Sequence, residues 1–226
     1  MEVKENLQHI QTKIERACAR SGRRPDEVTI IAVTKYVSNA RAQEAVDCGI
    51  LHLAENRKEG LLEKQSLIQD PKVTWHLIGT LQTRKVKDIV GKVDFFHALD
   101  RIKLATELNK RIPEGQLNCF VEMNISGEES KHGITEADLD KFIDALAGFE
   151  HLRVVGLMTM APNTEDTDVI RQVFHRLRIL RDRIRERHIP YAPCTELSMG
   201  MSHDYEIAVE EGATFVRIGT SLVGNE

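Results

Sequence analysis

The chain has 226 residues, of which 41% are hydrophobic and 29% are charged, a composition typical of a soluble globular protein with a sizeable core. Its formal net charge of -4 at pH 7 argues against a dedicated nucleic-acid or membrane-surface binder. No apolar run approaches the roughly 20 residues that a membrane-spanning helix needs.

The cysteines and the N-terminal segment favour a reducing cytoplasm. Residues 1–22 are amphipathic and carry acids as well as bases, which fits neither a secretory signal nor a transit peptide. The cysteines form no CxxC pair, so neither a zinc knuckle nor a dense disulfide framework is indicated. Nine histidines show no HExxH spacing, and we expect no metal site. The four cysteines are Cys18, Cys48, Cys119 and Cys194.

The first two elements are a packing helix and a buried strand. Apolar residues recur at helical spacing over 3–17, and Gly22 then ends that helix. Residues 28–33, VTIIAV, form a β-branched run typical of a strand buried on both faces, and this strand leads into Lys35. A lysine at the mouth of an apolar core loses hydration, which lowers its pKa and favours the neutral amine of a Schiff-base nucleophile. Taken alone, a lysine at a strand end more often only marks where burial stops.

Strands and helices then alternate to the end of the chain. Further strands are predicted at 51–54, 73–78, 93–99, 117–124, 152–158, 195–198 and 214–218. Helices are predicted between Ser38 and Gly49, near 57–68, 82–90 and 101–111, and at 136–147, 166–187 and 204–211. Eight strands separated by helices predict a single α/β domain over 1–226, a (β/α)8 TIM-type barrel with an extra N-terminal helix. A doubly wound open sheet is the alternative, although the chain lacks the dinucleotide-binding motif GxGxxG and the phosphate-binding motif GxxxxGK[ST].

In such a barrel the chemistry lies at the C-terminal ends of the strands. Small and hydroxyl residues follow the last two strands, where free backbone N–H groups can bind a phosphate. Singly, each of these loops is more often only a turn. Strand ends carry Lys35, Glu55, Asn56, Arg57, His76, Gly79, His97, Asp100, Glu122, Met123 and Asn124, and the candidate phosphate residues are Ser198, Gly200, Gly219 and Thr220.

Motifs along nearly the whole chain are similar to those of the pyridoxal phosphate (PLP) homeostasis protein family. They are AVTKYVS at 32–38, ENR at 55–57, WHLIGTLQTRK at 75–85, KHG at 131–133, GLMTMAP at 156–162, SMGMSHDY at 198–205 and VRIGTSLVG at 216–224. That family resembles the barrel domain of alanine racemase, a fold type III PLP enzyme. The resemblance implies PLP as cofactor, an internal aldimine on Lys35 and Arg217 facing the pyridine nitrogen. It also implies that Ser198, Gly200, Gly219 and Thr220 hold the phosphate and that Asn56, His76 and Met201 line the pocket. From the residues alone, His76 is equally well a satisfied core histidine.

The same resemblance bears on catalysis. A permanently cationic Arg217 beside the pyridine nitrogen disfavours protonation of that nitrogen and makes the cofactor a poorer electron sink. In the racemases a tyrosine from a second domain assists, and here the chain ends at Glu226. We expect Tyr36, which alternates with Lys35, to point away, and Tyr205 to pack. The chain is therefore read as a PLP carrier for vitamin B6 homeostasis without efficient catalysis, and a weak PLP-dependent racemase is the alternative.

The expected partners follow from that reading. PLP is the ligand, PLP-dependent apoenzymes are possible recipients, and a monomer is expected because the domain that builds the racemase dimer site is missing. Helix 166–187 carries seven arginines, which could suggest an RNA-binding face. Its regular apolar stripe instead leaves the arginines on the solvated side, so nucleic acid is not expected as a partner.

Overall fold

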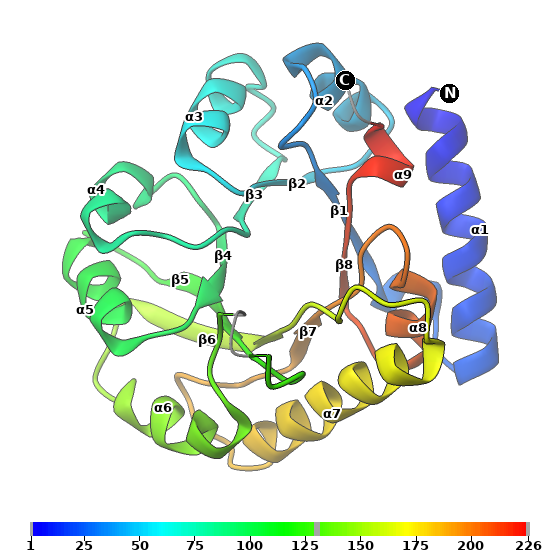
Figure 1. The fold of residues 1–226 in the computed structure, drawn as a ribbon. Coiled ribbons are helices and arrows are strands. Elements are labelled where there is room, and N and C mark those ends of the chain that lie inside the picture. The colour runs from blue at the N-terminus through cyan, green and yellow to red at the C-terminus, as the bar shows by residue number, and fades with distance from the viewer. Residues whose placement is uncertain (1, 129–131, 225–226) are drawn as a thin grey trace.

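A computed structural model describes residues 2–128 and 132–224. Lys131 of the KHG motif and the terminal Glu226 lie outside these residues. Eight parallel strands close into one barrel in chain order, and β8 pairs with β1, so that Thr29 lies opposite Phe215 (Figure 1). The strands are β1 (Thr29–Val33), β2 (His52–Glu55), β3 (Thr74–Leu77), β4 (Phe95–Leu99), β5 (Leu117–Glu122), β6 (Leu152–Met158), β7 (Glu196–Ser198) and β8 (Phe215–Ile218). The predicted (β/α)8 barrel is confirmed, and the open sheet is excluded.

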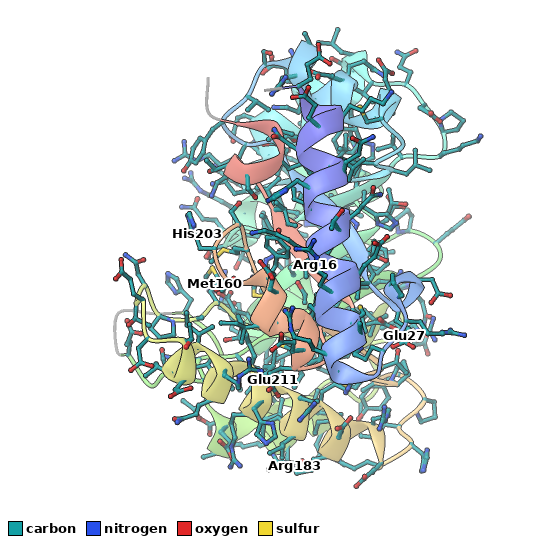
Figure 2. The ribbon with its side chains drawn as sticks, turned by 90° about the vertical axis from the view of Figure 1, so that its right-hand side faces the viewer. Arg16, Glu27, Met160, Arg183, His203 and Glu211 are labelled. Atoms are coloured by element: carbon teal, nitrogen blue, oxygen red, sulfur yellow. The ribbon has the colours of Figure 1, made fainter. Side chains whose placement is uncertain are left out.

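Helices surround the barrel, and α1 runs along its outside against α8 and α9 (Figures 1 and 2). The helices are α1 (Val3–Ser21), α2 (Asn39–Asp47), α3 (Lys58–Leu67), α4 (Val86–Ile89), α5 (Ile102–Arg111), α6 (Leu139–Ala145), α7 (Thr167–Arg185), α8 (Tyr205–Glu210) and α9 (Thr220–Val223), with 3-10 turns η1 (Pro25–Glu27), η2 (Thr83–Lys85) and η3 (Glu136–Asp138). Gly22 adopts φ 69° and ends α1, as its position predicted. The sequence analysis missed α9, a single turn that follows β8.

The interior of the barrel is filled by side chains. Its apolar part is small, because the main core lies between the strands and the surrounding helices. The interior cluster consists of Ile31, Val33, Ala54, Phe120, Val155, Met158 and Phe215. Gly156 on β6 allows β7 to approach closely, because a Cβ there would lie 2.1 Å from the carbonyl oxygen of Glu196 on β7.

The arginines of α7 are neutralised by neighbouring acids. Arg171 pairs with Glu210 at 2.5 Å and with Glu211 at 3.1 Å, and every other arginine of α7 also has an acidic partner. The prediction of a wholly solvated arginine face is wrong for Arg181, which is buried and donates to the carbonyl oxygen of Thr195 at 2.5 Å. Within the described ranges, no helix has both the length and the apolar composition to cross a membrane.

Candidate functional site

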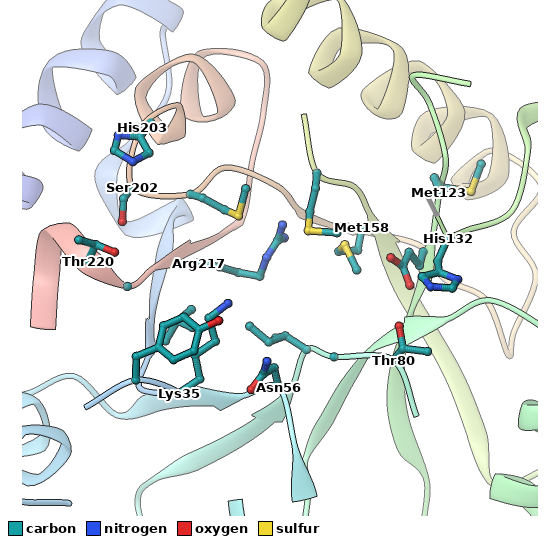
Figure 3. Close-up of a pocket in the computed structure, with 18 of the residues that line it drawn as sticks. Lys35, Asn56, Thr80, Met123, His132, Met158, Ser202, His203, Arg217 and Thr220 are labelled. Carbon is teal, nitrogen blue, oxygen red and sulfur yellow. The ribbon is translucent and has the colours of Figure 1, made fainter. Parts of the chain in front are cut away.

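A cavity of about 550 Å³ opens at the C-terminal ends of the strands (Figure 3). Its wall comes from the ends of β1, β5, β6 and β8 and from the segments that follow these strands and β2, β3 and β7, so residues far apart in the sequence face one volume. Its lining residues are Val33, Lys35, Tyr36, Val37, Asn56, Ile78, Gly79, Thr80, Glu122, Met123, Asn124, Ile125, Ser126, His132, Met158, Met160, Met201, Ser202, His203, Arg217, Gly219, Thr220 and Gly224. Six of the nine sequence-predicted site residues therefore lie on the wall, namely Lys35, Asn56, Met201, Arg217, Gly219 and Thr220. His76, Ser198 and Gly200 do not.

The backbone segment that carries Lys35 into the cavity is held in place by hydrogen bonds. The preceding residue, Thr34, is buried and donates its hydroxyl to Glu55 Oε1 at 2.7 Å, and its backbone N–H binds the carbonyl oxygen of Ala54. Lys64 Nζ lies 3.1 Å from the same Glu55 oxygen. The side chain of Lys35 itself is exposed, so the desolvation expected from its position at a strand end is not seen.

Tyr36 also lines the cavity, contrary to the expectation that it points away. Strand β1 ends at Val33, so the alternation of side chains that supported the expectation no longer applies at residue 36. The Lys35 ammonium lies 4.8 Å from the centroid of the Tyr36 ring, and Tyr36 is 64% exposed. The two side chains are therefore neighbours on one wall.

Arg217 forms the floor of the cavity. It is buried and donates from Nη1 to Ser198 Oγ at 2.6 Å and from Nη2 to the carbonyl oxygen of Thr159 at 3.0 Å. Burial lowers the pKa of Arg217 to about 10, although the negative charges of Asp204 and Glu122 oppose this shift. The guanidinium remains a cation at neutral pH.

Two predicted phosphate residues, Ser198 and Gly200, do not lie on the cavity wall. The hydroxyl of Ser198 is fully buried and is taken up by Arg217 and by His97, whose Nδ1 lies 2.8 Å away. Gly200 turns the chain with φ +92°, and a Cβ there would lie 2.6 Å from the Cβ of Ala208. Neither residue presents a side chain to the cavity, whereas Ser202 does. The sequence offered Ser202 only as one hydroxyl in the loop 198–204.

His76 is a core residue rather than a pocket residue. Its side chain has no exposed surface and lies between His52 and His97 inside the barrel. The interpretation as a satisfied core histidine, left open by the sequence, is therefore the one that the structure supports. The prediction that it lines the pocket is wrong, because the end of β3 places Ile78 and Gly79 at the wall instead.

Glu122, the last residue of β5, was named among the strand ends but not among the predicted site residues. It lines the cavity with 5% of its surface exposed, and its Oε2 is buried without a hydrogen-bond partner among the described residues. Burial raises its pKa to about 7, and the charge of Asp100 adds to this, whereas His132 and Arg217 oppose it. A carboxyl that changes its charge near neutral pH inside a cavity is typical of a functional site. Its sequence signal was an acid at the C-terminal end of an apolar strand.

Glu122 is expected to make the protein less stable as the pH rises. The folded state keeps a proton on this carboxyl up to about pH 7, whereas the unfolded chain releases it near the usual 4.5. The free energy of unfolding should therefore fall across that interval, by on the order of 3 kcal/mol. Urea unfolding across the interval would measure the fall. Glu122→Gln should flatten it, and an unchanged slope in this variant would contradict the assignment.

Other chemistries find less support in the described part of the chain. No group of three or more histidines, cysteines or acids there is arranged to hold a metal ion. All four cysteines are free thiols, and burial raises the pKa of Cys194 to about 12. Burial also raises the pKa of Cys18 and Cys119, so these three buried thiols are poor nucleophiles at neutral pH.

The chain is similar to proteins of one family along nearly its whole length. The family model for the alanine racemase N-terminal domain matches residues 5–226. A pyridoxal phosphate homeostasis protein of Aquifex aeolicus (strain VF5) is 39% identical over 222 residues, covering 97% of this chain and 96% of that protein. A protein of the same name from Escherichia coli (strain K12) is 37% identical over 232 residues, covering 99% and 96%.

Solved structures agree with the barrel. PipY of Synechococcus elongatus PCC7942, solved with PLP bound, superposes with a TM-score of 0.81 at 32% identity, covering 94% of this chain and 100% of that chain. Alanine racemase from Corynebacterium glutamicum gives a TM-score of 0.72 at 12% identity, covering 98% of this chain and 60% of that chain. At that identity the racemase likeness concerns the fold alone.

Proposed function

This chain belongs to the pyridoxal phosphate homeostasis protein family, within the wider family of the alanine racemase N-terminal domain, and from this we propose that it binds PLP on Lys35. The observation that carries the proposal is the placement of an exposed lysine amine, a buried guanidinium and a hydroxyl-bearing loop around one cavity (Figure 3). These groups match an aldehyde, a pyridine ring and a phosphate respectively. The PLP-bound state of PipY, a relative of known structure, supports the same ligand.

When bound, PLP supplies an aldehyde that condenses with a primary amine and loses water. Lys35 is the amine that this chain offers, and the Schiff base would form at its Nζ. Arg217 would direct its cation at the pyridine nitrogen and keep that nitrogen unprotonated. Gly219, Thr220 and Ser202 would hold the phosphate through backbone N–H and hydroxyl groups. Asn56 and Met201 would complete the wall.

Titration of the purified protein with PLP, followed by visible absorption, tests this proposal. A Schiff base on Lys35 should give a yellow band that borohydride removes, because reduction converts the C=N bond into an amine. Free PLP, which is itself yellow, is first removed by gel filtration, and absence of a band on the protein would then refute the proposal.

The phosphate half of the site can be tested by comparing PLP with pyridoxal. Thr220→Val or Ser202→Ala should weaken PLP binding by about tenfold, because each removes a hydrogen bond to a charged group. Binding of pyridoxal, which lacks the phosphate, should change little, and equilibrium titrations measure both affinities. Thr80→Val is the matched control, since Thr80 lines the same cavity on the side away from Thr220 (Figure 3). An equal loss for both ligands would place the phosphate elsewhere.

We further propose that the protein holds PLP for homeostasis rather than catalysing turnover. The names of its relatives support this reading, and so does Arg217, which makes the cofactor a poor electron sink. The alternative of a weak racemase draws on Tyr36, a second acid–base group in the cavity. Tyr36 lies beside the Lys35 amine rather than across from it, which does not suit proton transfer on two opposite faces. Chiral chromatography after incubation with amino acids decides: turnover abolished by Lys35→Ala and by Tyr36→Phe would favour the racemase.

The proposed setting is a monomer in the cytoplasm that passes PLP to apoenzymes. Four free cysteines fit a reducing compartment. Gel filtration over a range of concentrations tests the monomer, and a stable dimer would refute it. Incubation of the PLP-loaded protein with a PLP-dependent apoenzyme tests delivery, which requires activation faster than release of PLP into buffer.

A further inference from the structure

Three histidines from neighbouring strands form a hydrogen-bonded row inside the barrel. Nδ1 of His52 on β2 lies 2.9 Å from Nε2 of His76 on β3, and Nδ1 of His76 lies 2.9 Å from Nε2 of His97 on β4. His76 and His97 have no exposed surface, whereas His52 is partly exposed. None of the three histidines lines the cavity, so none of them would touch the bound PLP.

The row ends at the floor of the cavity. Nδ1 of His97 lies 2.8 Å from Ser198 Oγ, and the same oxygen accepts a hydrogen bond from Arg217 Nη1 at 2.6 Å. A continuous line of hydrogen bonds therefore runs from the partly exposed His52 to the guanidinium that faces the cavity. Its members come from β2, β3, β4, β7 and β8, and only closure of the barrel brings them together.

The guanidinium fixes the direction of every hydrogen bond in this line. Arginine can only donate, so Ser198 Oγ is the acceptor in the bond with Arg217. The hydroxyl hydrogen of Ser198 then needs an acceptor, and His97 Nδ1 is the only other hydrogen-bond partner of that hydroxyl in the described chain. His97 must therefore carry its hydrogen on Nε2 and donate it to Nδ1 of His76. Since Nδ1 of His76 is then an acceptor, His76 carries its own hydrogen on Nε2 and donates it to Nδ1 of His52. If His97 instead carried its hydrogen on Nδ1 and donated it to Ser198, the buried hydroxyl hydrogen of Ser198 would have no acceptor.

Burial keeps the row neutral, and two of its rings stack on phenylalanines. It lowers the pKa of both His76 and His97 well below the usual value, and the neighbouring positive charges act in the same direction. Phe95 stacks on His76 with centroids 4.7 Å apart, and Phe120 stacks on His97 at 4.4 Å. Because no ring readily becomes a cation, the row is suited to fixing orientations rather than to conducting protons.

We propose that this row is a positioning device, in which His97 and Ser198 hold Arg217 in the one orientation that presents its guanidinium to the pyridine nitrogen of PLP. The role toward PLP rests on the proposed function. The direction of the hydrogen bonds does not, because it follows from contacts within the protein alone. His76 and His52 extend the row and fix the tautomer of His97.

The direction can be tested on the cofactor-free protein. Imidazole ¹H–¹⁵N correlation spectra of the labelled wild type should show His76 and His97 as neutral rings with hydrogen on Nε2, unchanged on titration through neutral pH. Assignment would come from His76→Gln and His97→Asn. An Nδ1–H tautomer or an imidazolium at His97 would overturn the proposal. The tautomers are read from the wild type, and the two variants serve only to assign its signals.

The role toward PLP can be tested by affinity for PLP and for its analogue with CH in place of the pyridine nitrogen. The wild type should bind PLP more tightly than the analogue. In Ser198→Ala the ratio of the two affinities should fall by about tenfold, the effect of one hydrogen bond to a charged group. His97→Asn, which can still accept from Ser198, should keep more of the preference than His97→Leu. Thr214→Val is the matched control, because among the described residues the hydroxyl of Thr214 bonds only Leu197 on β7.

Each result separates the positioning role from the alternatives. If Ser198→Ala weakens both ligands equally, the row is merely structural and the proposal is wrong. If the wild type binds neither ligand, the proposed function fails and the role toward PLP fails with it. The imidazole spectra would still decide the direction of the row in that case.

Discussion

Lys35→Ala should abolish covalent attachment of PLP. After incubation with PLP and reduction with borohydride, the intact mass of the wild type should rise by one reduced cofactor, and that of the variant should not. Lys35 is the one lysine on the cavity wall among residues 2–128 and 132–224, and its amine is exposed to the cavity. Removal of the amine leaves no nucleophile in contact with a bound aldehyde.

Two variants make this result specific to Lys35. Lys35→Arg keeps the positive charge but cannot form a stable Schiff base, so it should retain reversible PLP binding and lose covalent trapping. Lys87→Ala removes an exposed lysine of α4, outside the cavity, and should behave as the wild type does. Peptide mapping after reduction identifies the modified residue. Equal labelling of the wild type and Lys35→Ala would show that trapping occurs on surface lysines, and the site would then be wrong.

The sequence predicted the barrel well because each strand is a local pattern. Eight apolar runs, punctuated by helices that end near glycine or proline, specify parallel βα units, and their number specifies closure. The order of the strand ends then places Lys35, Arg217 and Thr220 around one opening. Conversely, α9 is a single turn, too short for a helical period to be recognised.

The roles within the site were harder to predict because they depend on contacts between distant residues. Ser198 looked like a phosphate residue beside a strand end, yet its hydroxyl bonds His97, 101 residues away. Tyr36 was misplaced because the strand ends three residues before it, and element boundaries are the least certain part of any periodicity argument. Burial and pairing across the barrel decide such roles, and neither can be read from a segment alone.

The largest expected loss of stability comes from Lys64→Met. Lys64 and Glu55 form an ion pair at 3.1 Å whose side chains are 7% and 2% exposed, and Thr34 donates to the same carboxylate directly before Lys35. Gly60 leaves room for this carboxylate, since a Cβ there would lie 2.6 Å from Glu55 Oε2. Removal of the ammonium leaves a buried charge without its partner. We expect the free energy of unfolding to fall by about 3–5 kcal/mol.

A double-mutant cycle separates the ion pair from lost packing. Glu55→Gln removes the charge but keeps an acceptor for Thr34, so Glu55→Gln with Lys64→Met should recover much of the stability lost in Lys64→Met alone. Lys58→Met breaks the more exposed pair of Lys58 with Asp88, and by urea unfolding it should cost less than about 1 kcal/mol. If Lys64→Met lowers the free energy of unfolding by no more than Lys58→Met does, the buried ion pair does not stabilise the backbone next to Lys35. Because Thr34 and Glu55 link the ends of β1 and β2, a destabilised pair should also weaken PLP binding at Lys35.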